Sequence, residues 1–214
     1  MDFLPQQISD YAEAFTREEG EVLAQLNRET WAKVLTPRML SGHIQGQTLR
    51  LFSLMAKPTY ILEIGTYTGY SAICLADGLQ QGGKLFTIDI NAELNDMVNR
   101  YIHLAGKQDQ IEALVGNAME VIPTIAVKFD FVFIDADKEN YSNYFDLVFD
   151  RLNLGAFIIA DNVLWSGKVI LPDAELDKET KALKDFARKL KADPRVETVL
   201  LPIRDGLLVA RKVG

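Results

Sequence analysis

The fold is decided by the stretch Tyr60-Ile61-Leu62-Glu63-Ile64-Gly65-Thr66-Tyr67-Thr68-Gly69-Tyr70-Ser71. Its first half is a short apolar run of the kind that forms a buried strand. The two glycines that follow let the chain turn sharply and let a ligand approach the backbone. Apolar residues from Ala72 to Leu79 then recur at helical spacing. A strand, a glycine loop and a helix in this order indicate the first unit of an α/β domain.

The same alternation continues toward the C-terminus. Apolar strands are predicted at residues 84–90, 111–115, 129–134 and 156–160, with helical patterns between them. Two final strands, 196–203 and 207–211, flank an Asp-Gly pair that signals a tight turn, so they are expected to run antiparallel. Five consecutive β-then-α units favour a parallel sheet with helices on both faces. The sequence therefore predicts an α/β fold with a mostly parallel, seven-stranded sheet and an antiparallel last strand.

The residues before this core show helical patterning. Apolar residues recur at helical spacing in segments 8–15, 22–35 and 47–55, and prolines follow the second and third segments. Such stripes are typical of core or dimer packing. No linker or internal repeat divides the chain. We therefore expect one domain, residues 1–214, in which N-terminal helices at 1–57 cover an α/β core at 58–214.

The composition is that of a soluble globular protein. Of the 214 residues, 48% are hydrophobic and 25% are charged. No apolar run approaches the roughly 18 residues of a membrane-spanning helix, and Met1-Asp2-Phe3-Leu4-Pro5 lacks the segments of a signal peptide. The single cysteine, Cys74, fits a reducing compartment, so we expect a cytoplasmic protein. The net charge of −7 argues against a nucleic-acid partner.

The glycine loop departs from the nicotinamide fingerprint G-x-G-x-x-G, because Tyr67 stands where the middle glycine would admit a pyrophosphate. Asp89 ends the next strand 20 residues after Gly69 (89 − 69), where an acid can bind ribose hydroxyls. Taken alone, the glycines fit a plain turn better than a ligand loop, and Asp89 fits helix capping equally well. Together they favour an adenosine-type ligand without pyrophosphate, above all S-adenosylmethionine, with its adenine near Gly116-Asn117-Ala118.

Polar residues also end the fourth and fifth predicted strands. Asp135 follows the fourth strand, and Asp161 and Asn162 follow the fifth. Because neighbouring strands lie about 4.8 Å apart, these side chains can converge on one ion. Two carboxylates and an amide oxygen suit Mg²⁺, with Ca²⁺ or Mn²⁺ as alternatives. The competing interpretation is helix capping by Asp161 and solvent exposure of Asp135.

Three runs of residues carry a family signature. They are Glu63 to Ser71, Phe133-Ile134-Asp135-Ala136-Asp137-Lys138-Glu139-Asn140-Tyr141, and Asp161-Asn162-Val163-Leu164-Trp165-Ser166-Gly167. Together they resemble the cation-dependent O-methyltransferases, the family that includes caffeoyl-CoA and catechol O-methyltransferases, and its small bacterial members in particular. The likeness extends from about Met39 onward. It implies a Rossmann-like class I methyltransferase fold, S-adenosylmethionine as cofactor, a divalent cation and a homodimer.

The resemblance also implies roles for individual residues. The implied S-adenosylmethionine contacts are Ser41, Gly42, Glu63, Gly65, Tyr67, Ser71, Asp89, Ala118 and Asp135. The implied cation ligands are Asp135, Asp161 and Asn162. Lys138 matches the candidate general base of the family, and Tyr141 and Trp165 would border the acceptor pocket.

These features predict methyl transfer to one hydroxyl of a small vicinal dihydroxy aromatic, with the cation on both acceptor oxygens. Lys138 would offset the charge of the phenolate or take the proton, its pKa lowered by the cation and by partial burial. Pro202 replaces a glutamate of the catechol enzyme, which favours the caffeoyl-CoA-like branch, and Arg204 is expected to lie in solvent. The alternatives are a tRNA hydroxyuridine O-methyltransferase, a nicotinamide or nucleotide-sugar dehydrogenase, and a nucleotide-binding module without catalysis.

Overall fold

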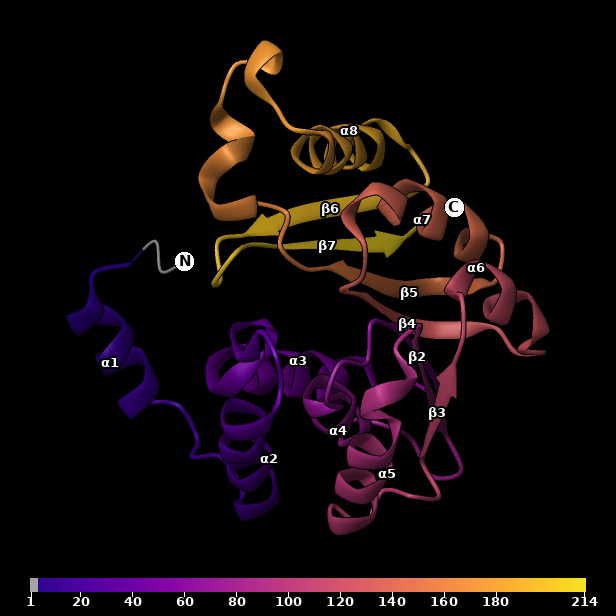
Figure 1. The fold of residues 1–214 in the computed structure, drawn as a ribbon. Helices are drawn as coiled ribbons and strands as arrows, with labels where there is room; N and C mark the ends of the chain where they lie inside the picture. The colour runs from indigo at the N-terminus through magenta and orange to yellow at the C-terminus, as the bar shows by residue number, and fades with distance from the viewer. Residues whose placement is uncertain (1–3) are drawn as a thin grey trace.

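The computed structural model describes residues 4–214 (Figure 1). Within that range no helix is long and apolar enough to cross a membrane. The expectation about a signal peptide rests partly on residues 1–3, which lie outside the described residues.

One seven-stranded sheet forms the centre of the molecule. Its strands are β1 Tyr60–Ile64, β2 Lys84–Asp89, β3 Ile111–Val115, β4 Phe129–Ile134, β5 Leu152–Ala160, β6 Val196–Leu201 and β7 Leu207–Lys212. Their order across the sheet is β3-β2-β1-β4-β5-β7-β6. Strands β1 to β5 pair in parallel, and β7 runs antiparallel to both of its neighbours, β5 and β6. The predicted mostly parallel sheet is confirmed.

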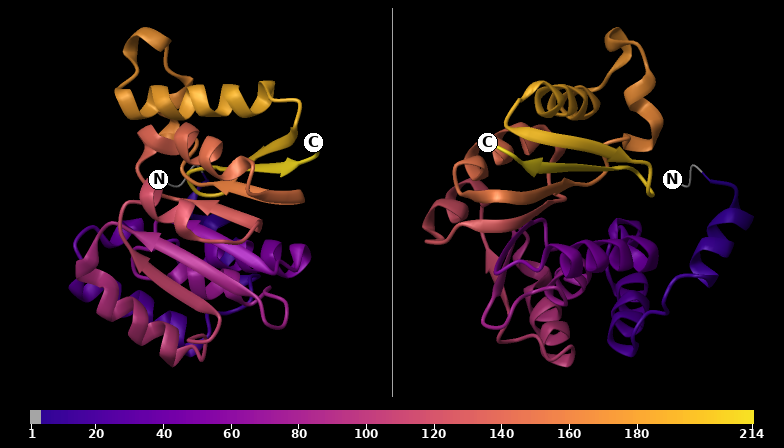
Figure 2. Two further views of the ribbon diagram at one scale, coloured as in Figure 1. Left: turned by 90° about the vertical axis from the view of Figure 1, so that its right-hand side faces the viewer. Right: turned by 180° about the vertical axis from the view of Figure 1, so that it is seen from behind.

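Helices cover both faces of this sheet (Figures 1 and 2). The α-helices are α1 Gln6–Ala14, α2 Glu21–Lys33, α3 Gly42–Ala56, α4 Tyr70–Ala76, α5 Asn95–Leu104, α6 Ala118–Val121, α7 Tyr141–Phe149 and α8 Lys178–Ala192. Short 3-10 helices join them: η1 Pro37–Met39, η2 Ala92–Leu94, η3 Ile122–Thr124, η4 Lys138–Asn140, η5 Trp165–Ile170 and η6 Asp173–Glu175. Helices α2 to α5 lie on one face of the sheet, and α6 to α8 lie on the other.

The core consists of two apolar layers, one on each face of the sheet. Along β1, Leu62 and Ile64 face the α6–α8 layer, whereas Ile61 faces the α2–α5 layer. Successive strand residues point to opposite faces, so a strand covered on both sides must be apolar at nearly every position. This is why β1 and β4 read as continuous apolar runs in the sequence.

Two elements begin earlier than the sequence predicts. Helix α3 begins at Gly42 rather than Gln47, and β5 begins at Leu152 rather than Ala156. Strand β7 lies between β5 and β6, because the hairpin inserts its second strand into the sheet. The position of β7 depends on pairing between strands far apart in the sequence, which local patterning does not encode.

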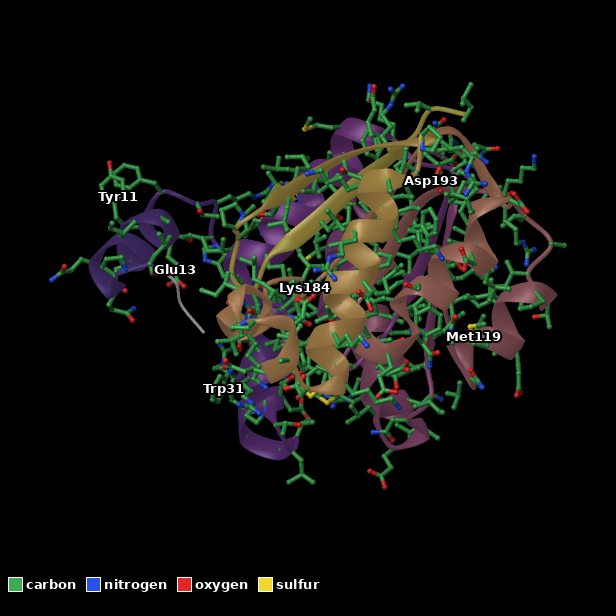
Figure 3. The ribbon with its side chains drawn as sticks, turned by 90° about the horizontal axis from the view of Figure 1, so that it is seen from above. Tyr11, Glu13, Trp31, Met119, Lys184 and Asp193 are labelled. Atoms are coloured by element: carbon green, nitrogen blue, oxygen red, sulfur yellow. The ribbon has the colours of Figure 1, made fainter. Side chains whose placement is uncertain are left out.

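Helix α1 buries none of its residues. Exposed apolar side chains follow one stripe along it: Ile8 and Tyr11 on the helix, and Leu4 and Phe15 just beyond its two ends. Figure 3 shows Tyr11 and Glu13 on this helix, standing clear of the rest of the molecule. The helix itself was expected, but in the single chain its apolar stripe packs against no core.

The order of the strands fixes where a ligand can bind. From β1 the chain proceeds outward through β2 and β3, then returns to β4 on the other side of β1. Ligands of open α/β sheets bind at such a switch point, beyond the carboxyl ends of the strands. The residues that follow β1, β2, β4 and β5 therefore define the candidate site.

Candidate functional site

Backbone hydrogen bonds hold the end of β1 and the loop after it against both neighbouring strands, β2 and β4. Gly65 N donates to Ile88 O at 2.9 Å, and Asp135 N donates to Ile64 O at 2.8 Å. Gly65 has φ +100°, and a Cβ at this position would overlap the carbonyl of Asp135. Only glycine satisfies both the left-handed backbone and the close approach of the two strand ends.

Asp89 anchors this loop from the neighbouring strand. Its Oδ2 accepts the backbone N–H groups of Thr66 at 3.0 Å and Tyr67 at 2.8 Å, and its Oδ1 accepts Asn91 N–H at 2.8 Å. The sequence left this acid open between ribose binding and helix capping. The cap of η2, the 3-10 helix that precedes α5, is instead Asn91, whose side chain accepts Glu93 N–H. Asp89 orders the ligand loop, and its partial exposure leaves it accessible to a ligand.

Two shallow hollows adjoin the loop, one on each side. The hollow on the β2 side has Asp89, Asn91 and Leu114 in its wall. The hollow on the β4 side brings together several of the predicted cofactor residues: Ser41, Gly65, Tyr67, Ser71 and Asp135. Because Thr66 and Tyr67 line both hollows, one elongated ligand could lie across the loop. Gly42, Glu63 and Ala118 line neither hollow, and Ala118 begins α6 beyond β3.

Glu63 is a buried acid with an unused oxygen. Thr87 donates to its Oε2 at 2.6 Å, whereas Oε1 is buried and has no hydrogen-bond partner in the described residues. Burial raises the pKa of Glu63 to about 8, against the opposing hydrogen bonds from Ser71 and Thr87. A buried acceptor without a partner costs free energy. It therefore fits the approach of a hydrogen-bond donor from a bound cofactor.

The predicted cation ligands lie at two adjacent strand ends. Ile134 and Ala160 are register partners, so Asp135 and Asp161 follow β4 and β5 side by side. Asp161 is only 3% exposed. Burial first, and the nearby Asp135 second, raise the pKa of Asp161 to about 7. Positive charge next to Asp161 would favour its ionised form and is therefore stabilising there.

Asn162 completes the candidate donor set. It has φ +59°, and its backbone N–H donates to Asp161 Oδ1 at 2.6 Å. Within residues 4–214 no three His, Cys, Asp or Glu side chains gather into a cluster that could hold a metal ion, so the candidate set depends on the amide oxygen of Asn162 as its third protein donor. Two carboxylates and an amide oxygen are a hard-oxygen set of the kind that Mg²⁺, Ca²⁺ and Mn²⁺ accept. The residues present therefore fit the expected cation.

Lys138 lies beside this pair as a buried cation. Its Nζ donates to Asp135 Oδ1 at 3.0 Å and to the Tyr141 hydroxyl at 2.8 Å, and that hydroxyl donates to Asp161 O at 3.1 Å. Burial by itself lowers the pKa of Lys138, as expected, but Tyr141 and Asp135 outweigh it and hold the pKa above its ordinary value. Lys138 is therefore an ammonium ion in this arrangement.

The two expected acceptor-pocket aromatics occupy different places. Tyr141 is fully buried, and its ring packs edge-on against Phe186. Its contact with the site is the hydrogen bond that its hydroxyl accepts from Lys138. Trp165 is partly exposed at the start of η5, with Lys138 Nζ 5.7 Å from its ring centroid. Its indole N–H is buried without a hydrogen-bond partner in the described residues.

Two residues that carried no site role in the sequence analysis join this set. Gln45 of α3 donates from Nε2 to Asp161 Oδ2 at 2.6 Å. Arg204 lies in the turn between β6 and β7, and its guanidinium donates to Leu40 O, Ser41 O and Gln45 Oε1. Arg204 was expected to point into solvent; it is exposed overall, but Nη1 is engaged at the site. Neither role has a local sequence signal, because the partners lie more than one hundred residues apart (116 for Gln45 and Asp161).

Together these features define an α/β protein with two hollows around a glycine loop, next to the buried carboxylate of Asp161 and the half-buried one of Asp135. The family model for O-methyltransferases matches residues 13–213. Caffeoyl-CoA O-methyltransferase 1 of Arabidopsis thaliana is 34% identical over 207 residues, which is 92% of this chain and 80% of that protein. The chain belongs to the O-methyltransferase family.

Solved structures agree. The O-methyltransferase TomG of Streptomyces achromogenes, in complex with S-adenosylmethionine, superposes with a TM-score of 0.90 at 28% identity, covering 97% of this chain and 96% of that one. The O-methyltransferase of Bacillus cereus, in complex with S-adenosylhomocysteine, gives 0.88 at 30% identity, covering 96% and 97%. These findings confirm the resemblance and the Rossmann-like methyltransferase fold. They favour methyl transfer over the dehydrogenase alternative.

Proposed function

We propose that this protein transfers the methyl group of S-adenosylmethionine to one hydroxyl of a vicinal dihydroxy aromatic, of catechol or caffeoyl type. In this reaction the S–CH₃ bond breaks as the new O–CH₃ bond forms, and the hydroxyl loses its proton. The observation that carries the proposal is the register of β4 and β5, which sets Asp135 and Asp161 side by side next to the glycine loop. The cofactor and the acceptor would thus meet at one strand end.

The cofactor half of the proposal rests on the two adjoining hollows. S-adenosylmethionine would lie across the loop, with Asp89 on its ribose, Ala118 near its adenine, and Ser41 and Gly42 at its methionine end. Glu63, Gly65, Tyr67, Ser71 and Asp135 would supply its other contacts. The unpartnered Oε1 of Glu63 supports a donor group arriving there. The ligands named for the Streptomyces and Bacillus structures support the same class of cofactor.

The acceptor half rests on the charges around Asp161. A phenol with a pKa near 10 is a poor nucleophile at neutral pH. A divalent cation held by Asp135, Asp161 and Asn162 would supply positive charge that favours the ionised hydroxyl and lowers the pKa of Lys138. The Lys138 ammonium offsets the charge of the ionised oxygen. To act as the base, Lys138 must first release its own proton. The side chain of Trp165 would border the acceptor.

An acceptor panel tests the proposed substrate class. We expect methyl transfer, with Mg²⁺ present, to caffeic acid, caffeoyl-CoA or simple catechols. We expect no transfer to matched monohydroxy compounds such as coumaric acid and phenol, whose rings carry only one hydroxyl. Equal rates on mono- and dihydroxy acceptors would contradict the proposal. So would methylation of tRNA without methylation of any catechol, because that result would identify the alternative acceptor.

We also propose that the protein is a homodimer in which α1 contributes contacts. Tyr11 is 65% exposed and Phe15 is 76% exposed, on one apolar stripe. Light scattering should give a dimer for the wild type and a monomer for the Tyr11→Ser/Phe15→Ser variant. Leu154→Ser, which removes an apolar side chain 75% exposed on β5, should remain a dimer. A monomeric wild type, or a dimeric Tyr11→Ser/Phe15→Ser variant, would contradict this assignment.

A further inference from the structure

Gln45 links helix α3 to the carboxylate of Asp161. Its side chain is buried, with 1% exposed. Nε2 donates to Asp161 Oδ2 at 2.6 Å, and Oε1 accepts from Arg204 Nη1 at 3.3 Å. The same guanidinium nitrogen donates to Leu40 O at 3.0 Å and to Ser41 O. A three-residue chain of hydrogen bonds thus runs from the β6–β7 turn through α3 to β5.

The chemistry of these groups fixes the orientation of the Gln45 amide. A guanidinium can only donate hydrogen bonds, and an ionised carboxylate can only accept them. If the amide turned over, its NH₂ group would face the donor Arg204, and its oxygen would face the acceptor Asp161. The contact with Arg204 would then be repulsive, and so would the contact with an ionised Asp161. Arg204 therefore makes Gln45 a donor toward Asp161.

The result is a carboxylate held at both oxygens. Asp161 Oδ1 accepts the N–H of Asn162, and Asp161 Oδ2 accepts Nε2 of Gln45. With one bond to each oxygen, rotation of the carboxylate is restricted, and each oxygen keeps a further lone pair. A metal-ligating carboxylate that is already oriented loses less conformational freedom when a cation binds, so binding costs less free energy.

We propose that Gln45 is a positioning residue for the cation site, and that Arg204 acts through it by fixing the orientation of its amide. This inference rests on the proposed function, since it assumes that Asp161 binds a divalent cation. Partners of this kind, which bond to a metal ligand without touching the metal, typically affect metal affinity by about 10-fold to 100-fold.

Calorimetric titration with Mn²⁺ and with Mg²⁺, without acceptor, tests the role of Gln45. Gln45→Met keeps the length of the side chain and removes both hydrogen bonds. We expect its cation affinity to fall about 10-fold to 100-fold, while its S-adenosylhomocysteine affinity stays unchanged. Gln47→Met is the matched control, because Gln47 lies on the same helix, is also buried, and makes no side-chain hydrogen bond within residues 4–214. Its cation affinity should equal that of the wild type.

The Arg204 variants test whether Arg204 acts on Asp161 through Gln45. Arg204→Met should weaken cation binding in the wild-type background and have no further effect on it in the Gln45→Met background, because Arg204 acts through Gln45. Arg204→Lys, which keeps a donor, should restore part of the affinity. Arg204→Met should also weaken S-adenosylhomocysteine binding, since Arg204 holds the Ser41 carbonyl. Since Arg204 is largely exposed, these variants remain informative if Gln45→Met does not fold.

The outcomes separate this inference from the proposed function. A wild type that binds neither Mn²⁺ nor Mg²⁺ overturns the cation site, and the inference falls with it. A wild type that binds a cation, with Gln45→Met binding it equally well, overturns the positioning role alone. Fully additive effects of Gln45→Met and Arg204→Met on cation affinity overturn the role of Arg204.

Discussion

The two halves of the site are built on different principles. The β1–β2 half is a loop ordered by backbone groups, in which Asp89 accepts two N–H groups from residues 22 and 23 positions earlier. The β4–β5 half is a set of charged groups: Lys138 and Asp161 are buried and Asp135 is half-buried. They are held by partners as distant as Gln45, 116 residues from Asp161. The first half is local in sequence, and the second depends on the assembled fold.

This contrast has an energetic consequence. The loop is ordered by backbone N–H groups, so a side-chain substitution in it leaves no buried charge without a partner. Such a substitution should therefore alter ligand binding more than folding. A buried charge, by comparison, is costly as soon as its partner is removed. We therefore expect changes in the β4–β5 half to have larger effects than changes in the β1–β2 half.

The largest effect is expected for Asp135→Ala. This change removes a cation ligand and the carboxylate that pairs with Lys138 at 3.0 Å. Turnover with Mg²⁺ should fall by roughly a thousandfold, about 4 kcal/mol of transition-state stabilisation. Steady-state kinetics on the best acceptor measures it. Asp150→Ala, at an exposed acid after α7, is the control and should keep full activity. Full activity of Asp135→Ala, with or without chelator, would contradict the account.

The next effect concerns stability against pH, through Glu63. The unfolded carboxyl ionises near its ordinary pKa of 4.5, whereas the buried one stays protonated until about pH 8. The unfolded state thus releases the proton first, so the free energy of unfolding falls as pH rises from 4.5 to 8 and levels off above that. Between pH 5 and pH 8, the two values measured below, Glu63 contributes roughly 3 to 4 kcal/mol to this decline.

Urea unfolding at pH 5 and pH 8 measures that contribution. Glu63→Gln, which mimics the protonated acid, should lose less stability than the wild type between the two pH values. Glu112→Gln, at an acid whose side chain is 44% exposed and faces Lys84, should follow the wild type. Identical declines for wild type and Glu63→Gln would show that Glu63 does not titrate in this range.

The smallest of these effects is expected in the β1–β2 half. Asp89→Ala removes the acceptor of the Thr66 and Tyr67 N–H groups and should weaken S-adenosylhomocysteine binding about tenfold, or about 1.4 kcal/mol. Asp89→Asn keeps an acceptor and should lose less. Calorimetry on both variants gives the comparison. An Asp89→Ala protein that binds as tightly as the wild type would mean that the loop is ordered without its acid.

The same contrast explains what the sequence could predict. Strands β3 and β4 match their predicted ranges residue for residue, because apolar runs and turn signals are local. The strand-end acids Asp135 and Asp161 were predicted together, because parallel strands end on one side. The roles of Gln45 and Arg204 were not predicted, since each depends on which distant segment packs against it. The raised pKa of Lys138 likewise reflects the balance of burial against two specific neighbours.

The most direct test of the proposed cation site is methyl transfer from S-adenosylmethionine to a catechol acceptor, measured after removal of divalent ions with EDTA and again after adding Mg²⁺. We expect the protein to bind S-adenosylhomocysteine in EDTA, while turnover is lost and returns with Mg²⁺. Turnover that is unchanged in EDTA would contradict the assignment of Asp135, Asp161 and Asn162 as a catalytic cation site.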